Sequence, residues 1–91
     1  GCVGAGIATD PNGFVSSCYS DSCGGSGIIP GSVGDNSVMT GNWITENGVY
    51  GIDINVAAEN CVVVGNRLTG NSSGEINDAS GTSTVVGNDT T

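Results

Sequence analysis

The side chains of this 91-residue chain that could do acid–base chemistry are almost all carboxylates: nine Asp and Glu stand against one basic residue, and there is no His. A lyase or epimerase that acts on a polyuronate needs a cation to neutralise the substrate carboxylate and a base to remove the adjacent proton. Arg67 is the one candidate cation, and Tyr19 and Tyr50 are candidate bases with no evident activator. The net charge of −8 would also repel a polyuronate. These residue types therefore argue against that chemistry.

Two carboxylates held close together would instead suit a glycosidase or a calcium ion. A glycosidase needs its pair about 5–9.5 Å apart, and Ca²⁺ takes clustered carboxylate and carbonyl oxygens. Asp53 and Glu75 stand at an offset of 22, which is one spacing of the internal repeat described below. That spacing places them outward on neighbouring strands, about 4.8 Å from each other. Two solvated acids are the simplest interpretation, so we predict no catalytic residue and no cofactor. A weakly bound Ca²⁺ at Asp53 and Glu75 is the alternative.

Charge and cysteine content limit the partners and the compartment of this chain. A single basic residue cannot displace the counterions of a nucleic acid or hold the chain on anionic lipid. No apolar run approaches the ~18 residues of a membrane span. Four cysteines in so short a chain favour an oxidising compartment. We therefore predict an extracellular location, no nucleic-acid partner and no membrane insertion. N-glycosylation motifs begin at Asn71 and Asn88, and their use is left open.

The elements that must position these residues follow from an internal repeat. Residues 60–71 match residues 36–47 at an offset of 24, with three Asn, a Gly and a Thr among the identities. Residues 82–88 repeat the first half of this unit at a further offset of 22, and residues 12–18 precede it at an offset of 24. Within a unit, short β-branched stretches alternate with Gly, Asn and Ser, which favour tight turns. Three such strands cannot enclose a core alone, but stacked coils can, with each strand parallel to its copy one turn away.

We therefore predict an all-β fold, a β-solenoid of about four coils with 22–24 residues per coil. A single module is expected over residues 1–91, with a shortened first coil at 1–11 and regular repeats over 12–88. An amide both donates and accepts, so stacked Asn side chains can form hydrogen-bonded ladders. The expected ladders are Asn42, Asn66 and Asn88, and Asn47 with Asn71. The expected inward apolar columns are Val15, Met39, Val63 and Val85, then Ile44 and Leu68, then Ile28, Ile52, Ile54 and Ile76.

Three stretches carry a family resemblance. They are Val-Val-Gly-Asn-Arg-Leu-Thr-Gly-Asn at 63–71, Gly-Val-Tyr-Gly-Ile-Asp-Ile at 48–54, and the ending at 77–88, which looks like a last coil. Over about residues 12–88 the pattern resembles the right-handed parallel β-helix superfamily, with its pectate-lyase-like fold, and in particular the C-terminal coils of phage tailspikes, surface proteins and polysaccharide-active members. The resemblance is specific for fold and not for activity. It implies right-handed coils, an extracellular or virion setting and, often, a carbohydrate partner.

The cysteines can be placed in the repeat frame. Residues 6–7 align with residues 27–28 at an offset of 21, and the same offset sets Cys2 directly beneath Cys23. Neighbouring coils bring two Cα atoms within the range that a disulfide spans. We therefore predict a Cys2–Cys23 disulfide, with a local Cys18–Cys23 link in an irregular loop as the alternative. Cys61 falls in an inward column of small residues and is expected to be a buried thiol.

The outward side of the first strand of each unit is the most suggestive surface. If Val63 points inward, its two neighbours point outward, so these strands are apolar on both faces, which is typical of strands covered on both sides. Scattered exposed valines are the simpler interpretation. The alternative is a lateral interface, joined by an aromatic pair one coil apart on the next strand. Its expected residues are Phe14, Val38, Val62, Val64, Val86, Tyr19 and Trp43.

These features predict a non-catalytic, extracellular structural module that assembles into a filament, a sheath or a trimeric spike as a homo-oligomer or polymer. Outward apolar faces and open coil ends would make the contacts. The alternative is a fragment of a carbohydrate-binding or polysaccharide-degrading β-helix protein (a tailspike, lyase or epimerase) whose catalytic coils lie elsewhere. An ice-binding solenoid is a third interpretation, which needs an outward rank of Thr at Thr45, Thr69 and Thr91.

Overall fold

The computed structural model describes residues 6–9, 12–30, 36–56 and 58–90, and within these ranges it consists of strands and turns without a helix. Every strand pair is parallel. The all-β prediction is therefore confirmed. The strands are β1 (Ile7–Thr9), β2 (Phe14–Ser16), β3 (Tyr19–Asp21), β4 (Ile28–Pro30), β5 (Val38–Thr40), β6 (Trp43–Thr45), β7 (Tyr50–Ile54), β8 (Val62–Val64), β9 (Arg67–Thr69), β10 (Gly74–Asp78) and β11 (Thr84–Val86).

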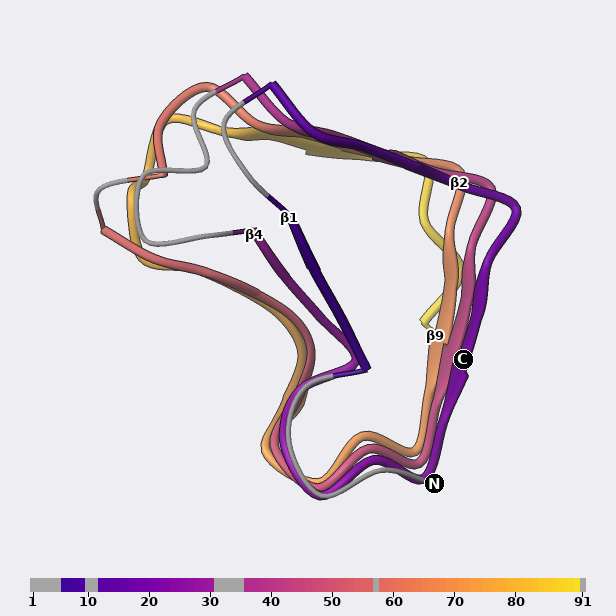
Figure 1. Ribbon diagram of the computed structural model, residues 1–91. Helices are drawn as coiled ribbons and strands as arrows, with labels where there is room; N and C mark the ends of the chain where they lie inside the picture. Colours follow the sequence, from indigo (N-terminus) through magenta and orange to yellow (C-terminus); the bar gives the residue numbers. More distant parts are fainter. Residues whose placement is uncertain (1–5, 10–11, 31–35, 57, 91) are drawn as a thin grey trace.

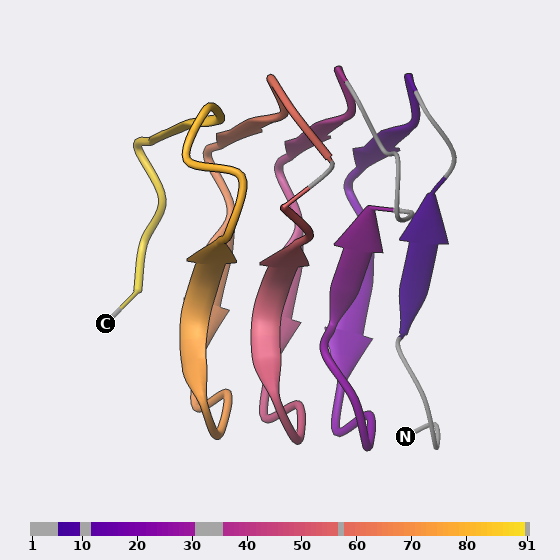
Figure 2. The same ribbon diagram turned by 90° about the vertical axis from the view of Figure 1, so that its left-hand side faces the viewer.

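The strands form three sheets that enclose one core. Sheet A has the order β1-β4-β7-β10, sheet B the order β11-β8-β5-β2, and sheet C the order β3-β6-β9. Figure 1 looks along the stacked coils and shows the three sheets as sides of one cross-section, with sheets B and C meeting at a corner after β2. Figure 2 shows the four strands of sheet A side by side, one from each coil. The chain thus winds as a solenoid.

The register gives the length of each coil. Phe14 pairs with Val38 and Val38 with Val62, each a step of 24, whereas Val62 pairs with Thr84, a step of 22. In sheet A the step from β1 to β4 is 21, as the pair of Ile7 and Ile28 shows. The predicted coil length, between 22 and 24, is therefore confirmed, together with the shorter first step.

The corners explain where Gly, Asn and Ser recur. Three corners of the coil use left-handed backbone. One of them has Ser17 at φ 54°, Gly41 at 66°, Gly65 at 68° and Gly87 at 65°. A left-handed corner is easily adopted by Gly and costs other residues free energy. Asn12, Asn36 and Asn60 make an equivalent corner before sheet B, with φ between 58° and 61°. The repeat therefore preserves turn geometry as well as core side chains.

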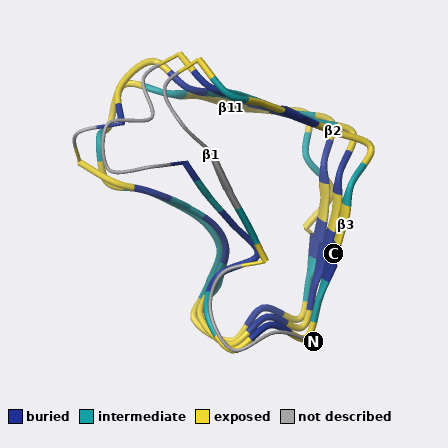
Figure 3. Cartoon of the chain, viewed as in Figure 1, coloured by how far each residue is buried: buried dark blue, intermediate teal, exposed yellow. Residues whose placement is uncertain are grey.

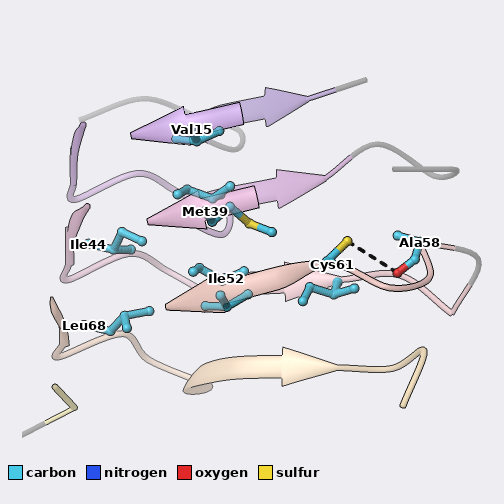
Figure 4. Packing of buried hydrophobic residues seen from close by; sticks show 10 residues of the cluster. Val15, Met39, Ile44, Ile52, Ala58, Cys61 and Leu68 are labelled. Atoms are coloured by element: carbon cyan, nitrogen blue, oxygen red, sulfur yellow. Dashed lines mark hydrogen bonds between the residues drawn. The ribbon is translucent and has the colours of Figure 1, made fainter. Parts of the chain in front are cut away.

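The core consists of stacked apolar side chains on the inward faces of the strands. Met39, Val63, Ile44, Leu68 and Ile52 are fully buried, and Figure 4 shows several of these side chains pointing into the interior. Burying each such side chain stabilises the fold by about 1.5–3 kcal/mol. Val85 departs from the expected column because it lies on β11, the end strand of sheet B among the described residues, and is 37% exposed.

Candidate functional site

The two acids that were the candidate Ca²⁺ ligands do not face each other. Asp53 pairs with Asn77, at an offset of 24, and Asn77 Nδ2 donates a hydrogen bond of 2.9 Å to Asp53 Oδ1. The prediction that Asp53 and Glu75 are equivalent is therefore wrong. In sheet B, residues of β11 pair with residues of β8 that are 22 positions earlier. In sheet A, the residues of β10 up to Asp78 still pair with residues of β7 that are 24 positions earlier. The shortening by two positions thus lies in the turn after β10, between residues 79 and 83.

Glu75 faces the interior instead of the solvent. It is in register with Gly51 of the preceding coil. A Cβ added to Gly51 would lie 2.8 Å from Leu68 Cδ2 and 2.9 Å from Asn71 Nδ2, so a side chain at this position of the coil points inward. The Glu75 carboxylate accepts a hydrogen bond of 2.6 Å from Asn71 Nδ2. Glu75 therefore satisfies the last amide of one Asn ladder. Among the described residues, no three His, Cys, Asp or Glu side chains come together in a way that could hold a metal ion.

The first Asn ladder runs through the corner between sheets B and C. The side-chain oxygen of Asn66 accepts two hydrogen bonds from Asn42, one from its backbone N–H (3.0 Å) and one from Nδ2 (2.9 Å). Asn88 accepts the same pair of hydrogen bonds from Asn66. Each Nδ2 also donates to a backbone carbonyl of the coil before it, as Asn66 does to Met39 at 2.9 Å. The ladder therefore ties the coils together with buried hydrogen bonds.

The second ladder follows the same rule one corner further along. Asn71 Oδ1 accepts from the N–H and Nδ2 of Asn47, at 3.0 and 2.9 Å. Asn71 is only 6% exposed, and its Nδ2 is fully engaged. The folded chain therefore does not present Asn71 for glycosylation, whereas Asn88 is half-buried. The structure thus brings together every residue of the two predicted ladders and assigns them to the fold.

The cysteines occupy the ladder corners of the first described coil. The backbone N–H groups of Cys18 and Cys23 donate to Asn42 Oδ1 and Asn47 Oδ1, each at 3.0 Å. Cys18 has a free thiol, so the alternative Cys18–Cys23 link is wrong. Cys2 lies outside the described residues, and the Cys2–Cys23 disulfide stays a prediction. Cys61 is a fully buried thiol that donates to the carbonyl of Ala58 at 3.6 Å, as Figure 4 shows.

The outward side of sheet B forms a face without charge, which we call the sheet B face. Its register places two outward columns on the four strands. Phe14 is 68% exposed and Val86 56%, while the central valines are half-buried. Figure 3 shows that buried and exposed segments alternate along this side of the coils. None of these side chains is ionisable. The face consists of Phe14, Ser16, Val38, Thr40, Val62, Val64, Thr84 and Val86.

The predicted aromatic pair lies on a different side of the molecule, on the outward face of sheet C. Tyr19 pairs in register with Trp43, and their ring centroids are 5.0 Å apart with an interplanar angle of 47°. Both rings are exposed, by 59% and 49%. The predicted interface is therefore two separate faces, on sheets B and C, that meet at the corner after β2 (Figure 1). We call the outward column of Tyr19, Trp43 and Arg67, with Asp21 beside it, the sheet C face.

Arg67 completes this column, a role that sequence reasoning missed. It pairs in register with Trp43, and its guanidinium carbon lies 5.5 Å from the Trp43 ring centroid, within the range of a cation–π contact. The signal was present in the sequence, because Trp43 and Arg67 occupy the same position of neighbouring repeat units. Tyr19 and Arg67 therefore flank Trp43 from the coils on either side.

The Tyr19 end of the sheet C face is electronegative. The pKa of Tyr19 is raised above its usual value near 10, mainly by desolvation, then by the charge of Asp21 and its hydrogen bond with the phenol, and then by the charge of Glu46. Thr45 pairs in register with Asp21 and Thr69 on sheet C and is only 8% exposed, so it adds little surface to an outward rank of Thr. Thr91, the third residue of that predicted rank, lies outside the described residues, so the ice-binding interpretation stays a prediction.

The comparisons with known proteins agree with this architecture. A family model described as the right-handed β-helix region matches residues 1–90 of the chain. The match spans all eleven strands and both outward faces, and it agrees with the right-handed winding that the sequence resemblance implied. No curated protein and no solved structure was found to match the chain. Within the described ranges, no helix has the length and apolarity that a membrane crossing requires.

Proposed function

We propose, from the premise that this chain belongs to the right-handed β-helix family, that it is a non-catalytic, extracellular structural module that associates laterally with copies of itself through the sheet B face. One observation carries the proposal: in a chain with a net charge of −8, the two outward columns of sheet B consist of apolar and hydroxyl side chains and bear no charge. The partner is a second copy of this chain.

Charge explains why identical copies would meet at this face. Two copies that each carry −8 repel each other wherever their carboxylates approach. On the sheet B face the outward residues are Phe, Val, Thr and Ser, so two such faces bury apolar surface against each other with no carboxylate in the contact. Phe14 contributes most, because two thirds of its side chain lies in solvent. Among the exposed rings of the described residues, Phe14 has the largest exposed fraction, and covering it removes apolar surface from water.

The size of the face sets the strength of a single contact. Four strands about 4.8 Å apart, with three residues of about 3.3 Å each, give a patch on the order of 200 Å² per copy. A stable protein–protein interface buries about 800 Å² per partner. A single pair of faces is therefore expected to associate weakly, with Kd in roughly the millimolar range. Stable assembly follows only when many such contacts are repeated in an array.

The sequence composition is consistent with an exposed structural role. Arg67 is the only basic residue, so trypsin has a single site in the whole chain. The buried Asn side chains are engaged in the ladders that hold the coils together. Both features favour a durable module that works outside the cell.

Sedimentation measured over a concentration series up to the millimolar range tests the proposal. Val62→Asp places a charge in the centre of the sheet B face, and Val56→Asp is its matched control on a 72% exposed valine outside that face. We expect the unmodified chain and Val56→Asp to show the same concentration-dependent increase in mass, and Val62→Asp to stay monomeric.

Phe14→Ser provides an independent check, because the Phe14 side chain is mostly exposed and its loss removes little from the monomer core. This variant should also reduce association, with an unchanged circular dichroism spectrum. Equal association of the unmodified chain, Val62→Asp and Phe14→Ser would overturn the role of the sheet B face. A chain that stays monomeric throughout the series would overturn self-association itself.

A further inference from the structure

The sheet C face carries an exposed aromatic pair that the core does not need. Tyr19 and Trp43 lie on the outward side of β3 and β6, with 59% and 49% of their surface in solvent. The inward residues of the same strands, Ser20 and Ile44, are buried. Exposed Trp, Tyr and Arg side chains are enriched among the residues that dominate binding energies at protein interfaces. The composition of this column is therefore that of a binding surface.

The column already shows which kind of group its rings accept. The guanidinium carbon of Arg67 lies 5.5 Å from the centroid of the Trp43 ring. The electron-rich face of an indole or phenol ring attracts a cation in this position, and arginine does so with its planar guanidinium. Trp43 has Arg67 as its neighbour in one adjacent coil and Tyr19 as its neighbour in the other. Because Arg67 is the only basic residue, no other basic side chain of this chain can lie against the Tyr19 ring.

The charges around Tyr19 favour a cation as well. Asp21 lies two residues further along the same strand, and its negative charge is one of the causes that raise the pKa of Tyr19. Glu46 adds a second negative charge that acts on the same phenol. Arg67 is on the far side of Trp43, so the Tyr19 end of the column combines an exposed ring with two carboxylates. A guanidinium can stack on the ring while it donates hydrogen bonds to a carboxylate.

We infer that the sheet C face docks a basic segment of another protein, in which an arginine or lysine side chain stacks on Tyr19 and pairs with Asp21. A second copy of this chain does not fit the site, because Arg67 is its only basic residue and is already placed on Trp43. Charge complementarity with a chain of net charge −8 favours a basic partner. The site is separate from the sheet B face, so it is independent of self-association.

Fluorescence titration tests this inference directly, because Trp43 is the only tryptophan of the chain and lies within the site. The probe is a capped hexa-arginine peptide, titrated at physiological ionic strength against the full chain at a concentration too low for self-association. A hexa-glutamate peptide and a neutral cello-oligosaccharide serve as comparison ligands. We expect a saturable change in Trp43 emission with hexa-arginine and none with the other two.

Variants separate local recognition from general charge attraction. Asp21→Asn and Asp53→Asn each remove one negative charge and keep a side-chain acceptor, but Asp53 lies on sheet A. Asp21→Asn is expected to weaken binding about two- to fivefold, and Tyr19→Leu by about the same factor. Asp53→Asn should leave the affinity nearly unchanged.

Equal losses in Asp21→Asn and Asp53→Asn would show that only net charge attracts the peptide, and would overturn the site. A saturable response to the oligosaccharide without one to hexa-arginine would assign the face to a saccharide instead. The absence of a saturable response to any of the three ligands would also refute the inference.

Discussion

Asn66 is the residue at which the ladder can be tested most sharply. It is the middle amide of the first ladder and is 2% exposed. Its Oδ1 accepts hydrogen bonds from the N–H and the Nδ2 of Asn42, and its Nδ2 donates to the carbonyl of Met39. Asn66→Ala removes these three hydrogen bonds, together with the one that Nδ2 donates to Asn88 Oδ1. Asn42 Nδ2 still donates to the carbonyl of Val15, and Asn88 Oδ1 still accepts from the backbone N–H of residue 66. The Asn42 N–H and the Met39 carbonyl oxygen are therefore the two groups that lose their ladder partner without such a second bond.

The expected loss follows from counting those groups. A buried donor or acceptor that loses its partner costs about 1–3 kcal/mol. Two of them give about 2–6 kcal/mol, with the lower end expected if water enters the space that the shorter side chain leaves. Domains of this size have free energies of unfolding of about 5–15 kcal/mol. The substitution should therefore remove a large part of the stability of the fold and lower its urea midpoint strongly.

Urea denaturation followed by circular dichroism provides the measurement, with two matched substitutions beside it. Asn55→Ala changes an exposed amide outside the ladders and should shift the free energy of unfolding by less than about 0.5 kcal/mol. Asn88→Ala removes the same kind of ladder oxygen, but at a half-buried position where water can replace it, so an intermediate loss is expected. An Asn66→Ala chain that is as stable as Asn55→Ala would refute the argument that the ladder holds the coils together.

Three further predictions concern the packing, the disulfide and the sheet C face. Gly51→Ala should destabilise the chain by about 1–3 kcal/mol in urea denaturation, because the added Cβ would lie 2.6 Å from the carbonyl oxygen of Glu75. Peptide mapping without reductant should recover a Cys2–Cys23 fragment and leave Cys18 and Cys61 as thiols; a Cys2 that maps as a thiol would contradict the pairing. In a Tyr50→Phe background, ultraviolet titration should show Tyr19 ionising above its usual pKa near 10, and Asp21→Asn should lower that pKa because it removes a nearby negative charge. An unchanged titration in Asp21→Asn would refute that assignment.

The residues that could be predicted from the sequence are those that every coil uses in the same way. Asn42 and Asn66 occupy the same corner, and Met39 and Val63 the same inward position, so a constant offset of 24 is enough to bring each pair together. Neighbouring coils give such residues the same surroundings, which is why identity along the repeat predicts contact in space. Asn88 and Val85 continue these columns by the shorter step of 22.

The position of the shortened step could not be predicted in the same way. The match between residues 62–66 and 84–88 shows that the last step is shorter by two positions, but it does not show where. Placing the shortening before Glu75 made Asp53 and Glu75 appear equivalent. Ile76 carried the opposite signal, because its alignment with Ile52 in the core needs an offset of 24, which the structure has. A residue that the core requires is therefore a better guide to register than a pair of solvated acids.

The contrast between inward and outward columns indicates where selection for function can act on such a chain. Inward columns repeat one type of side chain, as Asn42, Asn66 and Asn88 do, because each coil must offer its neighbours the same contact. The outward column on sheet C holds three different side chains, those of Tyr19, Trp43 and Arg67. These residues occupy equivalent positions in the parallel pairing of β3, β6 and β9. Backbone pairing alone would be satisfied by many outward residues there. The choice of two rings and the only basic residue of the chain is therefore not explained by folding, and it places the search for partners on the outward faces of the solenoid.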